Sequence, residues 1–190
     1  MKYATKQKFW SALLCFLLLG FGSVAQAAIL NYSIVGAGSG SLGGESFVDA
    51  SFTISMSGDA SLFNGVDINP LINSSVSIDG FGTAEIDGGT RLGINGSIIF
   101  FSRSSGFDLF DFYLAAPVDL TQPFGPLSGT GVFALYQFDD VGTSLGLLSL
   151  NSSSDVLFQA SNVPEPAVVW LLCSGLAGLL AFKHRYNKKT

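Results

Sequence analysis

The strongest constraint on this fold is a stretch in which apolar and polar residues alternate. Every second residue from Val48 to Met56 is apolar, and the residues between them are Asp, Ser or Thr. Successive side chains of a β-strand point to opposite faces, so a period of two predicts a half-buried strand and does not fit a helix.

Similar short runs recur along the chain, separated by turn residues. Dipeptides such as Asp79-Gly80 and Asn95-Gly96 tolerate positive φ and suit tight turns, whereas the proline-containing segment 117–126 predicts a longer loop. The sequence therefore predicts an all-β domain, an antiparallel sandwich or jelly roll of roughly ten strands. The further strands are expected at Ile29–Val35, Ser75–Ile78, Thr83–Ile86, Arg91–Ile94, Ser97–Ser102, Phe107–Leu114, Gly131–Phe138, Ser144–Leu150 and Asp155–Ala160. The expected core aromatics are Phe100, Phe101, Phe110, Phe112, Phe133 and Phe158.

The first 27 residues have the three parts of a signal peptide. Three lysines precede an apolar run from Phe9 to about Phe21, and Ala25 and Ala27 form an A-x-A cleavage site. We expect signal peptidase to cut between Ala27 and Ala28 after export through the inner membrane. An uncleaved signal anchor is the alternative.

A second apolar segment lies near the C-terminus. The 16 residues from Ala167 to Phe182 would span about 24 Å as a helix, slightly less than a typical hydrocarbon core, which predicts a short transmembrane helix. The basic residues of the tail favour the cytoplasmic side and leave the intervening domain outside. These tail residues are Lys183, Arg185, Lys188 and Lys189.

The motif directly before this helix carries a family resemblance. Val163, Pro164, Glu165, Pro166 and Ala167 are followed by the apolar helix and the basic tail, and this order resembles the PEP-CTERM sorting signal over residues 163–190. The same tail has also been called an ice-binding protein C-terminal motif, a label from which we infer no ice binding. A plain single-pass anchor is the alternative.

The resemblance implies a processing partner and a destination. In that family the Pro-Glu-Pro tripeptide is recognised by exosortase, a membrane cysteine protease. Its carriers are typically surface or biofilm-matrix proteins of Gram-negative bacteria that make exopolysaccharide. We therefore expect a transient inner-membrane anchor and a final place at the outer surface or in the matrix, with exopolysaccharide as an expected contact.

The middle domain, residues 28–162, is strongly acidic. Of the 14 acidic residues only Glu165 lies outside it, whereas Arg91 and Arg103 are its only basic residues. Such a charge repels phosphate backbones, so no nucleic-acid partner is expected. The domain also has no Cys, His or Lys, which removes a serine–histidine triad, a thiol nucleophile and Schiff-base chemistry and predicts a non-enzyme.

Two motifs imitate functional sites. Gly38, Gly40 and Gly43 spell the dinucleotide fingerprint, but the alternating strand that follows supplies no helix N-terminus for a pyrophosphate, so we interpret the motif as a glycine-rich turn. Glu85 and Asp87 share one strand face, similar to β-jelly-roll glucanases, yet Thr90 stands where the second catalytic glutamate belongs.

Two alternatives remain beside the non-catalytic structural or interaction role. One is a carbohydrate-binding or carboxylate-dependent polysaccharide-active domain, for which Tyr32, Tyr113 and Tyr136 would replace the absent tryptophan platform. The other is an adhesion module stabilised by calcium at Asp139-Asp140 and the Asp-Gly turns. No other cofactor is expected.

Overall fold

The computed structural model describes residues 29–105, 108–133, 141–163 and 174–175. Within residues 29–163 it shows an antiparallel β-domain, which confirms the all-β prediction. The elements are β1 (Ile29–Leu42), β2 (Glu45–Asp59), the 3-10 helix η1 (Ala60–Leu62), β3 (Asp67–Ile68), β4 (Asn73–Ile78), β5 (Gly82–Glu85), β6 (Thr90–Asn95), β7 (Ile98–Arg103), β8 (Asp108–Tyr113), β9 (Phe124–Phe133), β10 (Val141–Thr143) and β11 (Gly146–Asn162).

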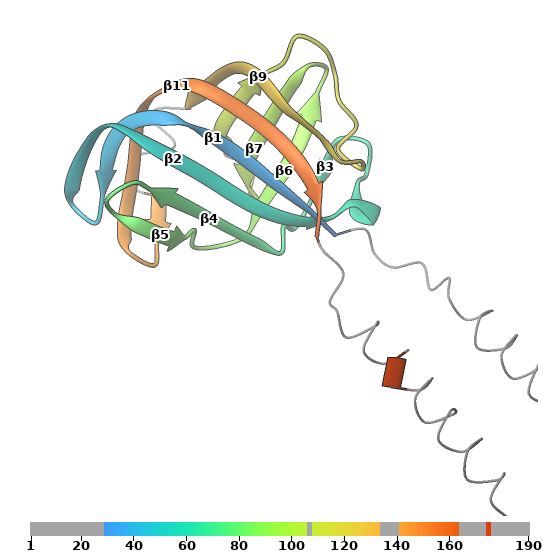
Figure 1. Cartoon of the computed structure of the whole chain (residues 1–190), viewed down its shortest axis with the longest axis horizontal. Coiled ribbons are helices and arrows are strands. Elements are labelled where there is room, and N and C mark those ends of the chain that lie inside the picture. The colour runs from blue at the N-terminus through green and yellow to red at the C-terminus, as the bar shows by residue number, and fades with distance from the viewer. Residues whose placement is uncertain (1–28, 106–107, 134–140, 164–173, 176–190) are drawn as a thin grey trace, which may run out of the picture.

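The strands form one continuous sheet that bends back over itself. Their order is β3-β6-β7-β8-β9-β11-β1-β2-β4-β5, with β10 paired to β11 off this path. Figure 1 shows β11, β1, β2 and β4 side by side in front, with β6 and β7 behind them. The two layers enclose the core, so the domain is sandwich-like.

Strand β11 joins the layers because its two halves have different neighbours. Its residues 156–160 pair with β9, whereas its residues 146–148 pair with β10. An isolated bridge between Ile86 and Thr143 then ties the end of β5 to β10. The strands β10, β11, β1, β2, β4 and β5 are neighbours in this order, and the bridge brings the two outer strands, β10 and β5, together. Few backbone groups are therefore left unpaired at these two edges.

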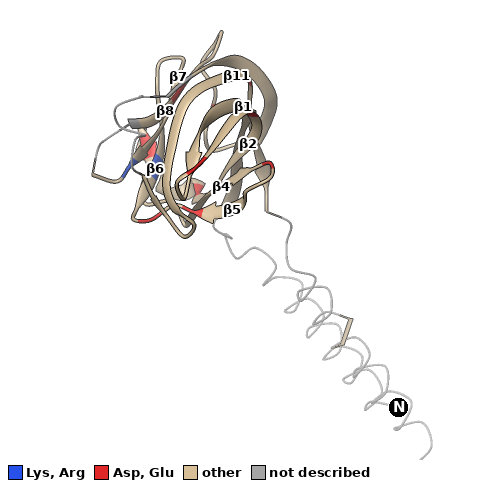
Figure 2. Ribbon diagram, turned by 90° about the vertical axis from the view of Figure 1, so that its left-hand side faces the viewer, with Lys and Arg blue, Asp and Glu red and all other residues tan. Residues whose placement is uncertain are grey.

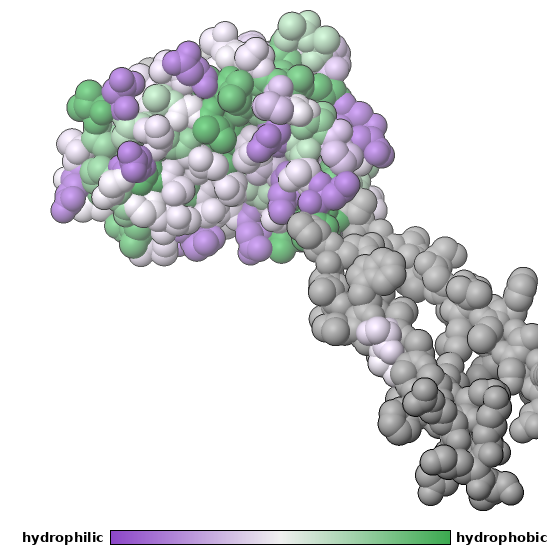
Figure 3. Space-filling view, viewed as in Figure 1, coloured by the Kyte–Doolittle hydropathy of each residue, from purple (hydrophilic) through white to green (hydrophobic). Residues whose placement is uncertain are grey.

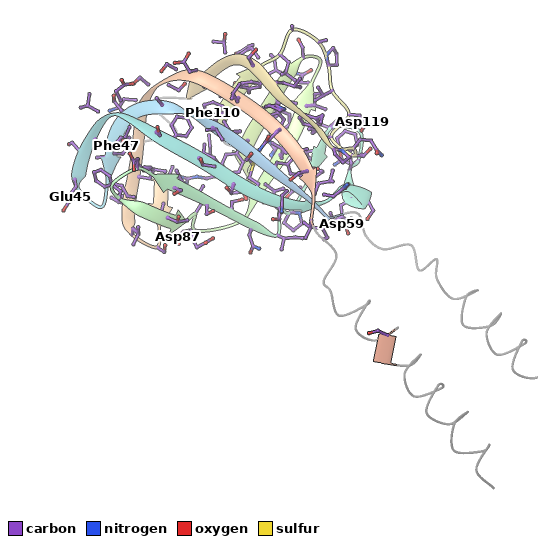
Figure 4. All side chains as sticks on the ribbon, in the orientation of Figure 1. Glu45, Phe47, Asp59, Asp87, Phe110 and Asp119 are labelled. Carbon is purple, nitrogen blue, oxygen red and sulfur yellow. The ribbon has the colours of Figure 1, made fainter. Side chains whose placement is uncertain are left out.

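The core is aromatic along its length. Phe101, Phe110, Phe112 and Phe158 are fully buried, and the Phe158 ring lies 5.8 Å from Phe112 and 5.2 Å from Phe124 between centroids. A smaller pair, Phe47 and Phe81, meets edge to face at 5.5 Å nearer the β1–β2 turn. Figure 4 shows Phe110 and Phe47 in the two regions of the interior.

Two of the expected core positions are wrong, in both cases because the side chain lies on the outward-facing side of its strand. Phe100 is only partly buried because Phe101, next to it on β7, faces inward. Val48 is 82% exposed because a bulge around Asp49, at φ 50°, shifts the register between β1 and β2, so that Phe47 takes the inward position. The side chain of Phe133 lies outside the described residues.

Several expected boundaries also change. Residues 146–150 of the predicted strand Ser144–Leu150 and the whole predicted strand Asp155–Ala160 belong to one 17-residue strand, β11, whereas Ser144 and Leu145 form the turn that precedes it. The predicted loop 117–126 gives way to β9 at Phe124, and residues 134–138 of the strand predicted at Gly131–Phe138 lie outside the described residues. Long-range pairing overrides the local turn signals of Asn, Ser and Pro at these places.

The glycine-rich turn is shorter than expected. Gly38 and Gly40 belong to β1, and only Gly43 and Gly44 form the turn, both with positive φ. A Cβ on Gly40 would clash with the carbonyl oxygen of Ser149 on β11. Gly40 is therefore needed for the close approach of two strands, and the strand β2 begins where a phosphate-binding helix would have to begin.

We expect Gly40→Ala to lower the free energy of unfolding by about 1–3 kcal/mol, because strands β1 and β11 must move apart to admit the methyl group. Urea unfolding of the purified full chain measures this loss, and Ser41→Ala on the same strand is the control. Unchanged stability of the Gly40 variant would contradict the described approach of β1 and β11.

Candidate functional site

The chain enters and leaves the β-domain at one place. Leu30 pairs with Asn162, and the Val163 N–H donates to the Ile29 carbonyl oxygen at 3.3 Å. Figure 1 shows the ends of β1 and β11 together at one pole. The segment before Ile29 and the segment after Val163 are thus attached to the domain at the same pole, which we call the terminal pole.

Most of the predicted sorting and cleavage residues lie outside the described residues. Val163 is described, exposed and placed directly after β11. Among the described residues no helix is long and apolar enough to cross a membrane, and of the predicted helix 167–182 only Ser174 and Gly175 are described, in helical conformation. The residues outside are Ala25, Ala27, Ala28, Pro164, Glu165, Pro166, Ala167, Lys183, Arg185, Lys188 and Lys189.

The two carboxylates of the glucanase-like motif do share one exposed face, as predicted. Glu85 ends β5, and the Asp87 N–H donates to the Gly142 carbonyl oxygen at 2.9 Å. Thr90 does not join them, because it is buried and its hydroxyl lies 2.6 Å from that of Ser74. The face therefore carries two adjacent acids without a third carboxylate at the position the motif requires.

Other acidic side chains serve local structure. The Asp59 carboxylate accepts hydrogen bonds from the N–H and hydroxyl of Ser61, and Asp119 does the same for Thr121. These bonds hold the pKa of the Asp119 carboxyl below its usual value. The described residues contain no group of three metal-binding side chains, and Asp139-Asp140 lies outside them.

The basic residues of the domain do not form a cationic surface. Arg91 on β6 donates to the Asp67 carboxylate at 3.0 Å, and its guanidinium lies 5.4 Å from the centre of the Phe100 ring. Figure 2 shows blue only near β6, while red is spread over the domain. Arg91 thus contributes to the packing of β3, β6 and β7.

Tyr32 ties β1 to the connection between β8 and β9. Its buried hydroxyl donates to the Leu120 carbonyl oxygen at 2.6 Å, and burial, with a smaller contribution from the Asp119 charge, raises its pKa. Figure 4 shows Asp119 and Asp59 at the end of the domain that carries the terminal pole, with Glu45 at the opposite end. The tyrosine predicted as a sugar-stacking platform is therefore a core residue.

We expect Tyr32→Phe to lower the free energy of unfolding by about 1–3 kcal/mol at neutral pH, because the buried Leu120 carbonyl oxygen loses its donor. Because the folded-state pKa of Tyr32 is raised, the stability of the wild type falls above about pH 10, where the unfolded state loses the phenolic proton first. The variant should lack this part of the fall.

Urea titrations at about pH 7 and about pH 11 measure both effects. Tyr113→Phe is the control, since Tyr113 is 43% exposed. An alkaline loss of stability equal in wild type and Tyr32→Phe would contradict the assignment.

The outer face of β11, β1, β2, β4 and β5 holds two rows of polar side chains at matched register. The amide row is Ser161, Asn31, Ser57 and Asn73, one residue from each of four neighbouring strands. The serine row runs parallel to the amide row, two residues away from it on each shared strand, and extends onto β5. It consists of Gln159, Ser33, Ser55, Ser75 and Glu85.

These rows border a surface groove. All of their members except Gln159 line a hollow of about 540 Å³, to which Tyr32 and Met56 contribute from beneath. Only one side-chain hydrogen bond joins the groove residues that the structure describes, from the Ser57 hydroxyl to the Asn31 amide oxygen at 2.7 Å. The face turned to the viewer in Figure 3 is largely white to purple, with green groups near its middle and along its edges.

Sequence reasoning did not identify this polar groove. The alternation of polar residues along β1, β2 and β4 predicts outward-facing side chains, but it does not say which residues of distant strands become neighbours. Ser33 and Gln159 meet only because the first and last strands of the domain pair. The signal available in the sequence was the prevalence of Ser and Asn at outward positions.

Comparisons with family models, curated proteins and solved structures found no match for this chain.

Proposed function

We propose that this chain is an exported protein whose acidic β-domain is sorted to the outer surface or extracellular matrix by its C-terminal signal, where it has a structural or interaction role without catalysis. Signal peptidase removes residues 1–27, the segment 167–182 holds the protein transiently in the inner membrane, and exosortase processes the motif 163–167. The PEP-CTERM resemblance of residues 163–190 is the basis for the processing step.

The observation that carries this proposal is the pairing of the two ends of the domain. Because the Val163 N–H bonds to Ile29, both apolar end segments are attached to the terminal pole. A domain held at that pole by either segment has its opposite pole, with the Gly43-Gly44 turn, directed away from the attachment. This arrangement suits display during and after transfer across a membrane.

The non-catalytic part of the proposal is supported by the chemistry of the domain. The domain has no His, Lys or Cys. Arg91 is held by Asp67 and Phe100, and the Glu85–Asp87 pair has Thr90 in place of a further carboxylate. A role in binding or in the architecture of a matrix uses these residues without requiring an activated nucleophile or a paired acid and base.

Processing is tested by mass spectrometry of the mature protein from cells with and without exosortase. We expect the mature chain to begin at Ala28 and to lack the segment 168–182 in wild-type cells, and to retain that segment when exosortase is deleted. Glu165→Gln combined with Pro164→Ala and Pro166→Ala should retain most of it in wild-type cells as well.

The matched control is Glu45→Gln, an exposed carboxylate at the opposite end of the domain. It should be processed as the wild type is. An identical C-terminus in the presence and absence of exosortase would contradict the proposal and favour a permanent single-pass anchor.

A further inference from the structure

The polar groove has the composition of a binding site for an uncharged, hydroxyl-rich chain. We propose that it binds a neutral polysaccharide, lying across the strands along the serine row. This inference goes beyond the proposed sorting and display. Binding is measured on the purified protein without exosortase, so either proposal can fail alone.

The hydrogen-bonding capacity of the groove is largely unused by the protein. Among the described residues, the hydroxyls of Ser33, Ser55 and Ser75 take no part in a side-chain hydrogen bond. Each hydroxyl offers one donor and two acceptor sites, and the Asn73 amide adds two donors and an acceptor. Sugar hydroxyls have the same dual character, so donors and acceptors can be matched in pairs along the row.

Charge restricts the ligand to an uncharged one. Neither row contains a basic residue, and Glu85 at the β5 end of the serine row carries a negative charge. The guanidinium of Arg91 is engaged by Asp67 elsewhere on the sheet. A uronate polymer, a nucleic acid or an anionic lipid surface would meet repulsion without a compensating cation.

The composition of the rows also disfavours a protein partner. Interface centres are enriched in Tyr, Trp, Phe, Met and Arg. Both rows consist of Ser, Asn, Gln and Glu side chains, and the Tyr32 and Met56 side chains beneath them are buried. A second copy of this chain would meet the same polar surface on its partner.

The shape of the groove favours an extended chain over a single sugar. The four members of the serine row that line the groove lie on four neighbouring strands, so they span about 14 Å at the usual spacing between strands, longer than one sugar ring. The next row along the strands begins with Leu157 and Val35, which are 41% and 37% exposed. These side chains offer apolar contact for the C–H faces of a ring beside the hydrogen-bonding row.

The test is affinity electrophoresis of the purified full chain in a detergent without a sugar headgroup. Native gels contain hydroxyethylcellulose or galactomannan as neutral polymers, or alginate as an anionic one. We expect retardation by at least one neutral polymer and none by alginate. The triple variant Ser33→Ala, Ser55→Ala, Ser75→Ala should bind about tenfold more weakly or worse, and Ser55→Ile, which fills the groove, should not be retarded.

The matched control removes three hydroxyls from exposed positions outside the groove, Ser46→Ala, Thr130→Ala and Ser152→Ala, and should keep wild-type retardation. Thermal melting of each variant verifies that it is folded. The proposal is overturned if neither neutral polymer retards the wild type. It is also overturned if the triple variant and Ser55→Ile are retarded as strongly as the wild type, or if alginate binds the wild type more strongly than the neutral polymers do. It is equally overturned if the wild type sediments as a dimer that Ser55→Ile converts to a monomer, because a second copy then occupies the face.

Discussion

The pairing of β1 with β11 is the constraint on which the rest of the structure depends. The two strands are in register from Leu30–Asn162 to Leu42–Leu148, with bulges near Ala37 and Gly40. This single ladder joins the first and last strands of the domain and brings Ile29 and Val163, the two ends of the domain, to the terminal pole. It also places β11 where its two halves can reach β9 and β10, so the sheet closes around the phenylalanine core.

The two exposed features of the domain follow from the same ladder. At the terminal pole it fixes Ile29 beside Val163, so the end segments that the sequence predicts to be a signal and an anchor have one point of attachment. On the outer face it aligns Asn31 with Ser161 and Ser33 with Gln159, which sets the registers of the amide and serine rows. The attachment and the polar groove are therefore two consequences of one strand pairing.

The sequence predicted the strand content well because the alternation of residues such as Phe52, Ile54 and Met56 is a local property. The prediction of which side chains face the core failed where an extra residue reverses the inward–outward alternation of a strand. The bulge at Asp49 exposes Val48 and buries Phe47, and no local pattern distinguishes a bulge from a regular strand. Phe100 was misassigned because aromatic character was counted without regard to its neighbour Phe101.

The candidate functional residues also divide into a local set and a non-local set. The predicted sorting motif is contiguous, so Pro164, Glu165 and Pro166 could be proposed from the sequence alone, and they lie outside the described residues. The polar groove gathers residues from five strands that are up to about 130 positions apart along the chain, and non-local pairing is what local propensity does not specify. The Glu85–Asp87 face was predicted correctly as a shared face, whereas the burial of Thr90 against Ser74 depended on the folded sheet.

The register of β1 against β11 is tested most directly by engineered cross-linking. The background is a full chain in which Cys15 and Cys173 are replaced by Ser. In the test pair, Asn31→Cys and Ser161→Cys, the two positions are directly opposite each other, within reach of a disulfide. In the control pair, Asn31→Cys and Gln159→Cys, the positions lie on the same face but are two residues out of register. Non-reducing electrophoresis after mild oxidation should show a faster-migrating, cross-linked monomer for the first pair and little for the second. Equal cross-linking of the two pairs, or stronger cross-linking of the second, would contradict the ladder that brings the two ends of the domain together and aligns the groove.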